Sequence, residues 1–326
     1  MRIAFLGAGK IAHTVARTLT QVPSLKLYAV AARDKNRAEA FASQYGFTKA
    51  YGSYEEMLAD PQVELVYIST VNNLHFEHMT LCIRAKKPVL CEKPFTSTAR
   101  EAREVLAMAA REKVFVGEAI WPRYVPLADT IVQLVNSGRL GEIVSLQANL
   151  GYPVSRVPRL DRLDLSGGAL LDIGVYTLTF ASLCFGDEVA GFDSTVRKSP
   201  SGVDQQSMVQ LCYANGRRAY LLSSSLTATD RTGVIYGSQG YAVVHNINNY
   251  QGVDIYNAGN ELVQQIKAPP QISGYEYQFL ACAEAVRKGE LEPAQMPHQT
   301  TIRIMDLMDS IRHSWSLYYP GEEAGK

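Results

Sequence analysis

The chain has 326 residues, of which 47% are hydrophobic and 20% charged, as in an ordinary globular protein. Its 32 basic and 32 acidic side chains give a formal net charge of zero, which excludes the broad basic surface that nucleic-acid binding generally requires. Because a single core rarely grows beyond about 250–300 residues, we expect two domains.

The first 120 residues alternate short apolar strands with helices. This rhythm predicts an α/β fold with a parallel sheet covered by helices on both faces, which is a doubly wound Rossmann arrangement. The predicted strands are 2–6, 25–31, 65–69, 89–91 and 114–117, and the predicted helices are 10–21, 36–45, 54–59, 76–85 and 99–111.

The pattern changes after Glu118. Extended segments follow one another between residues 189 and 255 with turn signals such as Asn215-Gly216, which predicts an antiparallel or mixed sheet. We therefore place a Rossmann domain at 1–120 and a second domain at 121–326, whose C-terminal segment can pack back on the first. The remaining predicted elements are a strand at 143–151 and helices at 127–137, 170–185, 275–287 and 300–315.

Targeting, membrane and redox signals are sparse. The five cysteines form no C-x-x-C pair, which favours a reducing, cytoplasmic compartment over a disulfide framework. The apolar stretch Met1–Leu6 is interrupted at Gly7, so it predicts a strand and not a signal peptide. The sequence has no run of about 18 apolar residues, so no membrane span is predicted.

A glycine-rich turn follows the first predicted strand. Gly7-Ala8-Gly9-Lys10-Ile11-Ala12 has the pattern G-x-G-x-x-A between a strand and a helix, which is the context that the dinucleotide fingerprint requires. Gly7 permits the tight turn, Gly9 lets the backbone approach a pyrophosphate, and Ala12 keeps the helix close to the strand. The helix N-terminus then offers free N–H groups to the phosphates.

The end of the second predicted strand favours NADP over NAD. Ala32 offers no carboxylate to bind a ribose hydroxyl, whereas Arg33 can hold a 2′-phosphate by a bidentate contact. Arg37 lies four residues further on, so at helical spacing both guanidinium groups can share one side. Asp34 leaves NAD open, because a shift by one residue would place its carboxylate in the ribose position.

Glu92-Lys93-Pro94 follows the strand predicted at 89–91. Ligands of open α/β sheets bind at the carboxyl ends of the strands, so Lys93 can reach a nicotinamide and a substrate hydroxyl. Glu92 can hold the lysine ammonium in place, and Pro94 allows a cis peptide bond.

Three motifs together resemble those of the Gfo/Idh/MocA oxidoreductases. They are the glycine-rich turn, Glu92-Lys93-Pro94, and the segment from Gly167 to Tyr176 with the sequence GGALLDIGVY. Within that family, the segments 31–34 and 118–124 resemble the dihydrodiol dehydrogenase branch, which also oxidises D-xylose with NADP. The resemblance implies a second domain with a large open sheet that covers the active site on one face and usually makes the oligomer contact on the other.

The resemblance also implies catalytic roles for Lys93, Asp172 and Tyr176. Asp172 would contact substrate hydroxyls, and on a helix it would share one side with Tyr176, four residues later. A free tyrosine has a pKa near about 10, and a neighbouring ammonium lowers it, so Tyr176 can accept the alcohol proton while hydride leaves carbon. Lys93 as the proton carrier is the alternative.

Further residues follow from the same resemblance. Thr70, Asn72 and His75 lie where relatives place a loop near the nicotinamide, although His75 can equally be a helix-start residue. Trp121 and Arg123 occupy positions where relatives keep an aromatic residue and an arginine, for which interdomain packing is the other reading. His75 and His78 lack a third ligand, so no metal is predicted.

The loop before Gly167 carries Tyr152, Arg156 and Arg159, and it can be either a substrate lid or a solvated loop. The sequence as a whole predicts an NADP-dependent dehydrogenase for a cyclic polyol, either a pyranose such as D-xylose or a trans-dihydrodiol, acting as a homodimer or higher homo-oligomer without nucleic-acid or membrane partners. A keto-sugar reductase and an NADP-sensing protein without turnover are the alternatives.

Overall fold

The computed structural model describes residues 1–322 and contains two compact units. Unit 1 comprises Met1–Tyr124 and Gln271–Ile302, and unit 2 comprises Val125–Pro270 and the chain from Arg303 onward. Each unit is built around one β-sheet.

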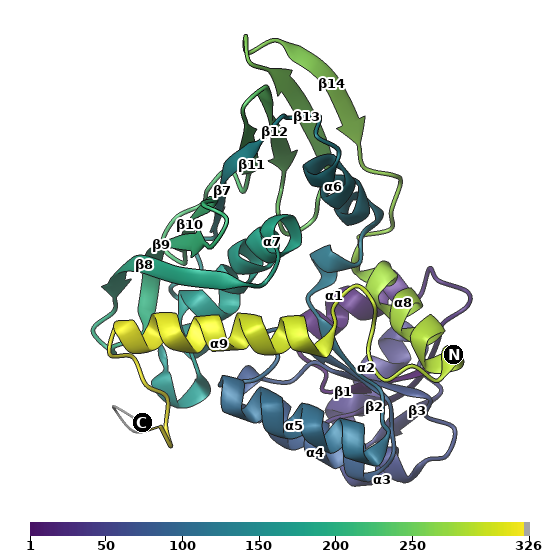
Figure 1. The fold of residues 1–326 in the computed structure, drawn as a ribbon. Helices are drawn as coiled ribbons and strands as arrows, with labels where there is room; N and C mark the ends of the chain where they lie inside the picture. Colours follow the sequence, from purple (N-terminus) through teal and green to yellow (C-terminus); the bar gives the residue numbers. More distant parts are fainter. Residues whose placement is uncertain (323–326) are drawn as a thin grey trace. The chain divides into compact units, whose positions relative to one another are not determined.

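The sheet of unit 1 has six parallel strands in the order β3-β2-β1-β4-β5-β6 (Figure 1). The strand order reverses between β1 and β4, as in Rossmann folds. Most of these strands are short, apolar and fully buried, as a sheet covered on both faces requires. The strands are β1 Arg2–Leu6, β2 Lys26–Ala31, β3 Lys49–Tyr51, β4 Leu65–Ile68, β5 Val89–Glu92 and β6 Val116–Ala119.

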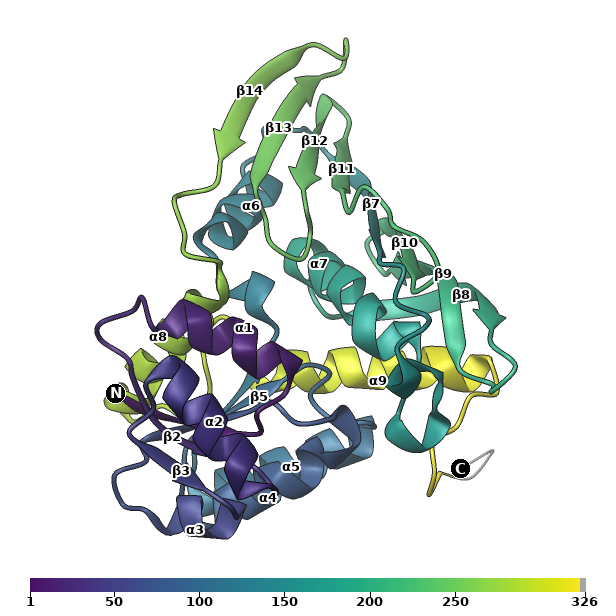
Figure 2. The ribbon, with the colours of Figure 1, turned by 180° about the vertical axis from the view of Figure 1, so that it is seen from behind.

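Helices cover both faces of this sheet. Helices α1 and α2 lie on one face and α4 and α5 on the other (Figure 2), because right-handed crossovers that run in opposite directions from the middle of the sheet fall on opposite sides. The helices of unit 1 are α1 Lys10–Leu19, α2 Lys35–Tyr45, α3 Tyr54–Ala59, α4 His75–Arg84, α5 Ala99–Glu112 and α8 Tyr275–Lys288.

Unit 2 contains an eight-stranded mixed sheet in the order β14-β13-β12-β11-β7-β10-β9-β8. Only the pair β7–β10 is parallel, and the other neighbours are antiparallel. Helix α7 packs on β7 and β10, and α6 packs on α7. The elements are α6 Pro126–Asn136, β7 Ile143–Gly151, α7 Val175–Phe185, β8 Val189–Lys198, β9 Asp204–Tyr213, β10 Arg218–Ser224, β11 Gly233–Gly237, β12 Gly240–His245, β13 Gly252–Asn257 and β14 Leu262–Lys267.

One helical stretch of unit 2, Leu163–Phe185, is long and apolar enough to cross a membrane by length and composition alone. Its most apolar window is 83% buried inside the protein, as in the core helix of a globular domain. The stretch is also irregular, because residues Leu170–Gly174 form a π-helical turn before α7 begins.

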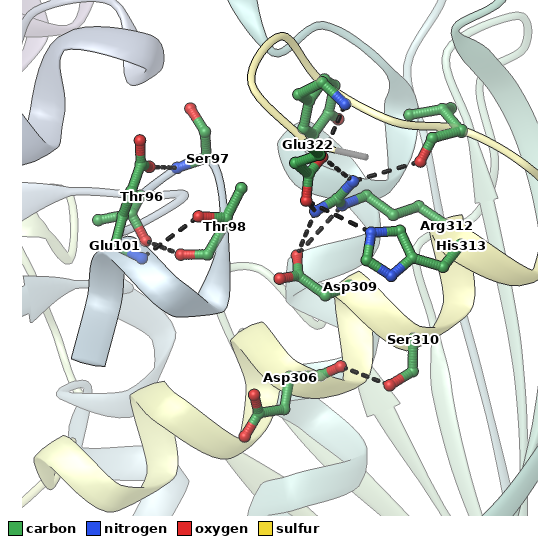
Figure 3. A network of polar contacts seen from close by, with 12 residues as sticks. Thr96, Ser97, Thr98, Glu101, Asp306, Asp309, Ser310, Arg312, His313 and Glu322 are labelled. Atoms are coloured by element: carbon green, nitrogen blue, oxygen red, sulfur yellow. Dashed lines mark hydrogen bonds and ion pairs between the residues drawn. The ribbon is translucent and has the colours of Figure 1, made fainter. Parts of the chain in front are cut away.

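The last helix, α9 (His298–Ser314), carries a buried arginine near its end. Arg312 is 1% exposed and binds both Asp309 and Glu322, while its guanidinium lies 4.7 Å from the centre of the Tyr319 ring (Figure 3). This cluster anchors the chain after α9 within unit 2.

The Rossmann sheet and the mixed second sheet confirm the predicted fold class, and three local features depart from the predicted elements. Two edge strands were not predicted: β3 has three residues, none of them fully buried, and β14 is exposed along almost its whole length. The third is the π turn, where the sequence predicted continuous α-helix over 170–185. Neither edge strand has the buried apolar pattern by which strands are recognised.

Asp60, just after α3, gathers hydrogen bonds from several elements of unit 1. Its Oδ2 accepts bonds from the Lys49 ammonium at 2.7 Å and from the phenols of Tyr51 and Tyr28 at 2.7 and 3.0 Å. Burial by itself would raise the pKa of Asp60, but these bonds and the Gln62 N–H outweigh it and hold that pKa well below its usual range.

Replacing Asp60 by asparagine should lower the free energy of unfolding by about 1.5–3 kcal/mol at pH 7, the usual contribution of hydrogen bonds to a charged group. Because folding lowers the pKa of Asp60, its contribution is fully present above about pH 4 and is lost as the pH falls below that value. Urea unfolding at several pH values measures both effects.

The matched control is Glu39→Gln, which removes an exposed carboxylate 4.0 Å from Lys35 and should change stability by less than about 0.5 kcal/mol. A difference between wild type and Asp60→Asn that did not shrink on acidification would contradict the assignment.

Candidate functional site

The fourteen residues predicted to lie near a cofactor all follow the carboxyl ends of five parallel strands of unit 1. Since the carboxyl ends of parallel strands leave a sheet at one edge, these residues belong to the edge where open α/β sheets bind ligands. They follow β1 (Gly7, Gly9, Lys10, Ile11 and Ala12), β2 (Arg33 and Arg37), β4 (Thr70, Asn72 and His75), β5 (Glu92 and Lys93, with Glu92 its last residue) and β6 (Trp121 and Arg123).

The turn after β1 requires glycine. Gly7 has a φ of +108°, and a Cβ there would lie 3.1 Å from the Thr70 methyl carbon and 3.2 Å from the Ser69 hydroxyl. Gly9 has extended backbone, and a Cβ there would meet only the Ser69 carbonyl oxygen, at 3.5 Å. The space above Gly9 is therefore open for the backbone to approach a ligand.

Helix α1 begins at this turn without a capping side chain, so its first N–H groups are directed to the edge of the sheet. The Arg37 guanidinium donates to the Ala8 carbonyl oxygen at 2.7 Å and brings a positive charge beside the turn. An uncapped helix start, a glycine without crowding and a nearby cation fit a dinucleotide pyrophosphate.

The end of β2 presents an exposed arginine. Helix α2 begins only at Lys35, so Arg33 precedes it and the predicted helical spacing between Arg33 and Arg37 does not hold. Asp34 is the N-cap of α2, and its carboxylate accepts the Asn36 N–H at 2.9 Å. The Asp34 carboxylate, which was the reason to keep NAD as an alternative cofactor, is thus used to cap α2, while Arg33 is exposed to solvent.

The loop after β4 leads into α4, whose first residue, His75, and His78 are two buried histidines. Burial lowers the pKa of both His75 and His78 to about 4, so both rings are neutral at pH 7. His75 Nδ1 lies 2.9 Å from the Pro94 carbonyl oxygen and Nε2 lies 3.2 Å from that of Thr70. A neutral ring has one N–H, and the shorter distance favours donation to Pro94.

Other residues of this loop also have partners inside unit 1. The Thr70 hydroxyl lies 2.9 Å from His78 Nδ1, and Asn72 is 7% exposed in the short helical turn Asn72–Leu74. Within residues 1–322, no three His, Cys, Asp or Glu side chains form a group that could hold a metal ion. Contact of Thr70, Asn72 and His75 with a cofactor stays a prediction.

The segment Glu92-Lys93-Pro94 is held by a side chain of the neighbouring strand β4 and by a bond within itself. One oxygen of Glu92 accepts a hydrogen bond from the Tyr67 phenol at 2.5 Å. The other oxygen accepts one from the Lys93 backbone N–H at 3.2 Å. The peptide bond between Lys93 and Pro94 is cis. Lys93 is half-buried, at the edge to which the glycine-rich turn also belongs.

Trp121 and Arg123 lie in a short helical turn after β6. The Trp121 ring stacks on Tyr275 of α8 with ring centres 4.3 Å apart, and Arg123 donates to the Gln295 carbonyl oxygen at 3.0 Å. Both side chains are thus braced by the segment of unit 1 that returns late in the sequence.

The predicted catalytic residues Asp172 and Tyr176 lie in unit 2. Asp172 lies in the π turn and Tyr176 in the first turn of α7, so the pair is not joined by regular α-helix as predicted. π-helical turns are rare and are frequently found at functional sites. Asp172 accepts a hydrogen bond from the Arg159 guanidinium at 2.9 Å, and Tyr176 is 8% exposed.

The glycines before Asp172 allow a loop to fold tightly over the helix start. A Cβ on Gly167 would lie 2.7 Å from the carbonyl oxygens of Arg159, Leu160 and Arg162, which only glycine avoids. This close approach brings Arg159 to Asp172. A second acid, Asp204, accepts the Leu170 N–H at 2.6 Å, and burial raises its pKa to about 6 against the effect of that bond.

Three residues that hold a predicted site residue, or the backbone beside one, were missed or left open by the sequence. Tyr67 had a signal, because a phenol inside a buried strand needs a hydrogen-bond partner. Arg159 was weighed only as part of a lid or solvated loop, and Asp204 carried no signal at all. The predicted proton carriers lie in different units, Lys93 in unit 1 and Tyr176 in unit 2.

Comparison with known proteins extends over both units. Residues 1–119 match the family model described as oxidoreductase family, NAD-binding Rossmann fold, and residues 129–243 match the GFO/IDH/MocA C-terminal domain. Trans-1,2-dihydrobenzene-1,2-diol dehydrogenase is 33% identical in Mus musculus, over 99% of both chains, and 31% identical in Homo sapiens, again over 99% of both.

Among solved structures, a 3-ketoreductase from Actinomadura kijaniata in complex with TDP-benzene and NADP has a TM-score of 0.85 and 26% identity, with 96% of each chain covered. Two variants of the same enzyme have also been crystallised with NADP. One has a lysine replaced by alanine, and the other has a tyrosine replaced by phenylalanine. This likeness extends over the Rossmann sheet and the second sheet alike.

Replacing Gly9 by alanine should separate ligand binding from folding. A Cβ at Gly9 has an ordinary contact with the protein, so the free energy of unfolding in urea should stay within about 0.5 kcal/mol of wild type. Affinity for a nicotinamide dinucleotide should fall by about tenfold or more. Quenching of tryptophan fluorescence measures the affinity.

Gly7→Ala is the counterpart and should lose stability as well as affinity, because φ is positive and Ser69 and Thr70 leave no room. Unchanged affinity in Gly9→Ala would remove the turn from the binding site.

Proposed function

The chain belongs to the Gfo/Idh/MocA oxidoreductase family, and we propose that it is an NADP-dependent dehydrogenase of cyclic polyols, either pyranose sugars such as D-xylose or trans-dihydrodiols. The observation that supports NADP most strongly is the end of β2, where Arg33 is exposed, Ala32 is buried and Asp34 caps α2. The NADP complexes of the related ketoreductase point the same way.

The substrate class is proposed from the relatives and from the side chains of unit 2. Curated relatives at about one-third identity act on a trans-dihydrodiol by name. Asp172 accepts a hydrogen bond from Arg159, and a carboxylate so placed is an acceptor suited to substrate hydroxyls. A cyclic compound with neighbouring hydroxyl groups meets both requirements.

Residue roles in the proposed reaction follow from chemistry. The bound nicotinamide supplies a hydride acceptor. Lys93 binds the reacting hydroxyl as a cation, Tyr176 takes its proton, and Asp172 orients the neighbouring hydroxyl. The alcohol loses a hydride from carbon and a proton from oxygen and becomes a carbonyl compound. Lys93 as the proton carrier is the alternative assignment.

The proposal is tested by reduction of NADP and NAD, followed at 340 nm, with pentoses, hexoses, inositols and trans-dihydrodiols. We expect reduction of NADP with at least one pyranose or dihydrodiol. Reduction only with acyclic simple alcohols, or only with NAD, would contradict the proposal.

A second candidate, a keto-sugar reductase, is favoured by one observation, the likeness to a 3-ketoreductase at 26% identity. The same residues serve either direction, because Tyr176 or Lys93 would then donate the proton. Oxidation of NADPH by 3-keto sugars, without measurable reduction of NADP by the corresponding alcohols at pH 7 to 9, would favour the reductase.

Replacing Arg33 by alanine should weaken NADP binding by about ten- to hundredfold, the usual loss of a hydrogen bond to a charged group, and leave NAD binding within about twofold. Isothermal titration with both dinucleotides measures the ratio. Arg100→Ala, an exposed arginine on α5, is the control and should change neither affinity. Equal losses for NADP and NAD in Arg33→Ala would overturn the phosphate contact.

Replacing Lys93 by alanine, or Tyr176 by phenylalanine, should lower kcat by about 10²–10⁴-fold and leave the NADPH dissociation constant nearly unchanged. If both groups serve one substrate, the double variant should be little slower than the slower single variant. Lys26→Ala and Tyr213→Phe, an exposed lysine and a buried phenol outside the site, are controls with near-normal kcat. Multiplicative losses would indicate independent roles, and near-normal turnover in Lys93→Ala would remove Lys93 from the mechanism.

A further inference from the structure

Tyr67 is a polar side chain in the middle of the buried strand β4. It is fully buried, and its ring packs edge-on against Phe5 and Phe279 with ring centres 4.9 and 5.0 Å apart. Burial raises the pKa of Tyr67 well above its usual value, and the neighbouring Glu92 charge adds to the effect. The phenol is therefore protonated at every working pH and acts as a hydrogen-bond donor.

The acceptor of that hydrogen bond is also the residue next to Lys93. Tyr67 donates to one oxygen of Glu92 at 2.5 Å, and the other oxygen accepts the Lys93 backbone N–H at 3.2 Å. One carboxylate thus joins the phenol in β4 to the backbone from which the Lys93 side chain leaves the sheet. His75 holds the following residue through the Pro94 carbonyl oxygen at 2.9 Å.

A buried carboxylate is costly unless donors compensate for the lost water. Glu92 is 6% exposed, and further ionisable groups lie close to it or to Tyr67: Cys91 and Glu118 near Glu92, and Tyr275 of α8 near Tyr67. Burial raises the pKa of Glu118 to about 7, with the Glu92 charge contributing. The Tyr67 phenol is a neutral donor that favours the charged form of Glu92 in these surroundings.

We propose that Tyr67 is a positioning residue for Lys93, acting through Glu92. The inference rests on the proposed catalytic role of Lys93. The phenol keeps Glu92 ionised and fixed in orientation, and Glu92 in turn fixes the backbone that aims Lys93. Without the phenol, one oxygen of Glu92 loses its hydrogen-bond donor and the carboxylate is held less firmly, so the lysine loses its direction although the cofactor turn at Gly7 and Gly9 is untouched.

A double-mutant cycle tests this relay with Tyr67→Phe, Glu92→Gln and the double variant. Tyr67→Phe should lower kcat by about tenfold with the NADPH dissociation constant within about twofold of wild type. The acid limb of its kcat profile should move to higher pH, because Glu92 takes up a proton more readily. In the Glu92→Gln background the same substitution should change kcat by less than about twofold.

The matched control is Tyr124→Phe. Tyr124 is also a buried phenol of unit 1, but it donates to the Glu118 backbone carbonyl and not to Glu92. It should lose a similar amount of stability in urea and keep the wild-type pH profile. A merely structural role for Tyr67 predicts the same behaviour in both variants and additive losses in the cycle, which would overturn the proposal.

A second readout does not depend on turnover. Without cofactor, each variant is treated briefly with acetic anhydride, and mass spectrometry compares acetylation of Lys93 with that of the exposed Lys26. Release of the half-buried Lys93 should raise its relative reactivity by about threefold or more in Tyr67→Phe and in Glu92→Gln, with no further rise in the double variant. Tyr124→Phe should match wild type.

The two readouts keep the two hypotheses apart. Absence of turnover in the wild type with every sugar and diol would contradict the proposed function, whereas the acetylation pattern would still decide on the relay. If Tyr67→Phe does not fold, Glu92→Gln alone decides by acetylation. Unchanged Lys93 reactivity in the folded variants would overturn the positioning role.

Discussion

The reversal of strand order between β1 and β4 is the constraint on which the nucleotide-binding edge of unit 1 depends. The chain that leaves β1 must turn away at once from the end of β4, and Gly7 does so with a φ of +108° beside Ser69 and Thr70. Helix α1 therefore begins uncapped at the edge of the sheet. Arg33 follows β2, which pairs with β1, and Lys93 follows β5, which pairs with β4, at that same edge. One topological feature therefore places the glycine-rich turn, the exposed arginine and the lysine.

Behind that edge, unit 1 buries two carboxylates on adjacent strands. Glu92 accepts a hydrogen bond from the Tyr67 phenol, and Glu118 accepts one from the Thr301 hydroxyl at 2.8 Å. Unit 2 repeats the theme with Asp204, whose oxygen receives the Leu170 N–H at the start of the helical segment that carries Asp172. Buried acids that are hydrogen-bonded hold the surrounding backbone in one arrangement, which is what precise placement of a reacting side chain requires.

Much of the fold was predictable because its signals are local. The glycine-rich turn lies between two elements that each have an apolar pattern, and the buried strands of unit 1 are short and apolar enough to be recognised one by one. The edge strands β3 and β14 lack such a pattern, since β3 has three residues and β14 is exposed. The pairing of Arg159 with Asp172 depends on a loop folding over Gly167, and residue spacing carries no information on that fold.

The central claim is that this chain moves a hydride from a ring carbon that bears a hydroxyl group to NADP. The most direct test uses a substrate deuterated at that carbon, such as D-xylose deuterated at C1, with mass spectrometry of the reduced cofactor. The account predicts that NADPH gains one deuterium on its nicotinamide ring and that turnover slows with the labelled sugar or diol. NADPH formed without deuterium, or no reduced cofactor from any cyclic polyol offered, would contradict it.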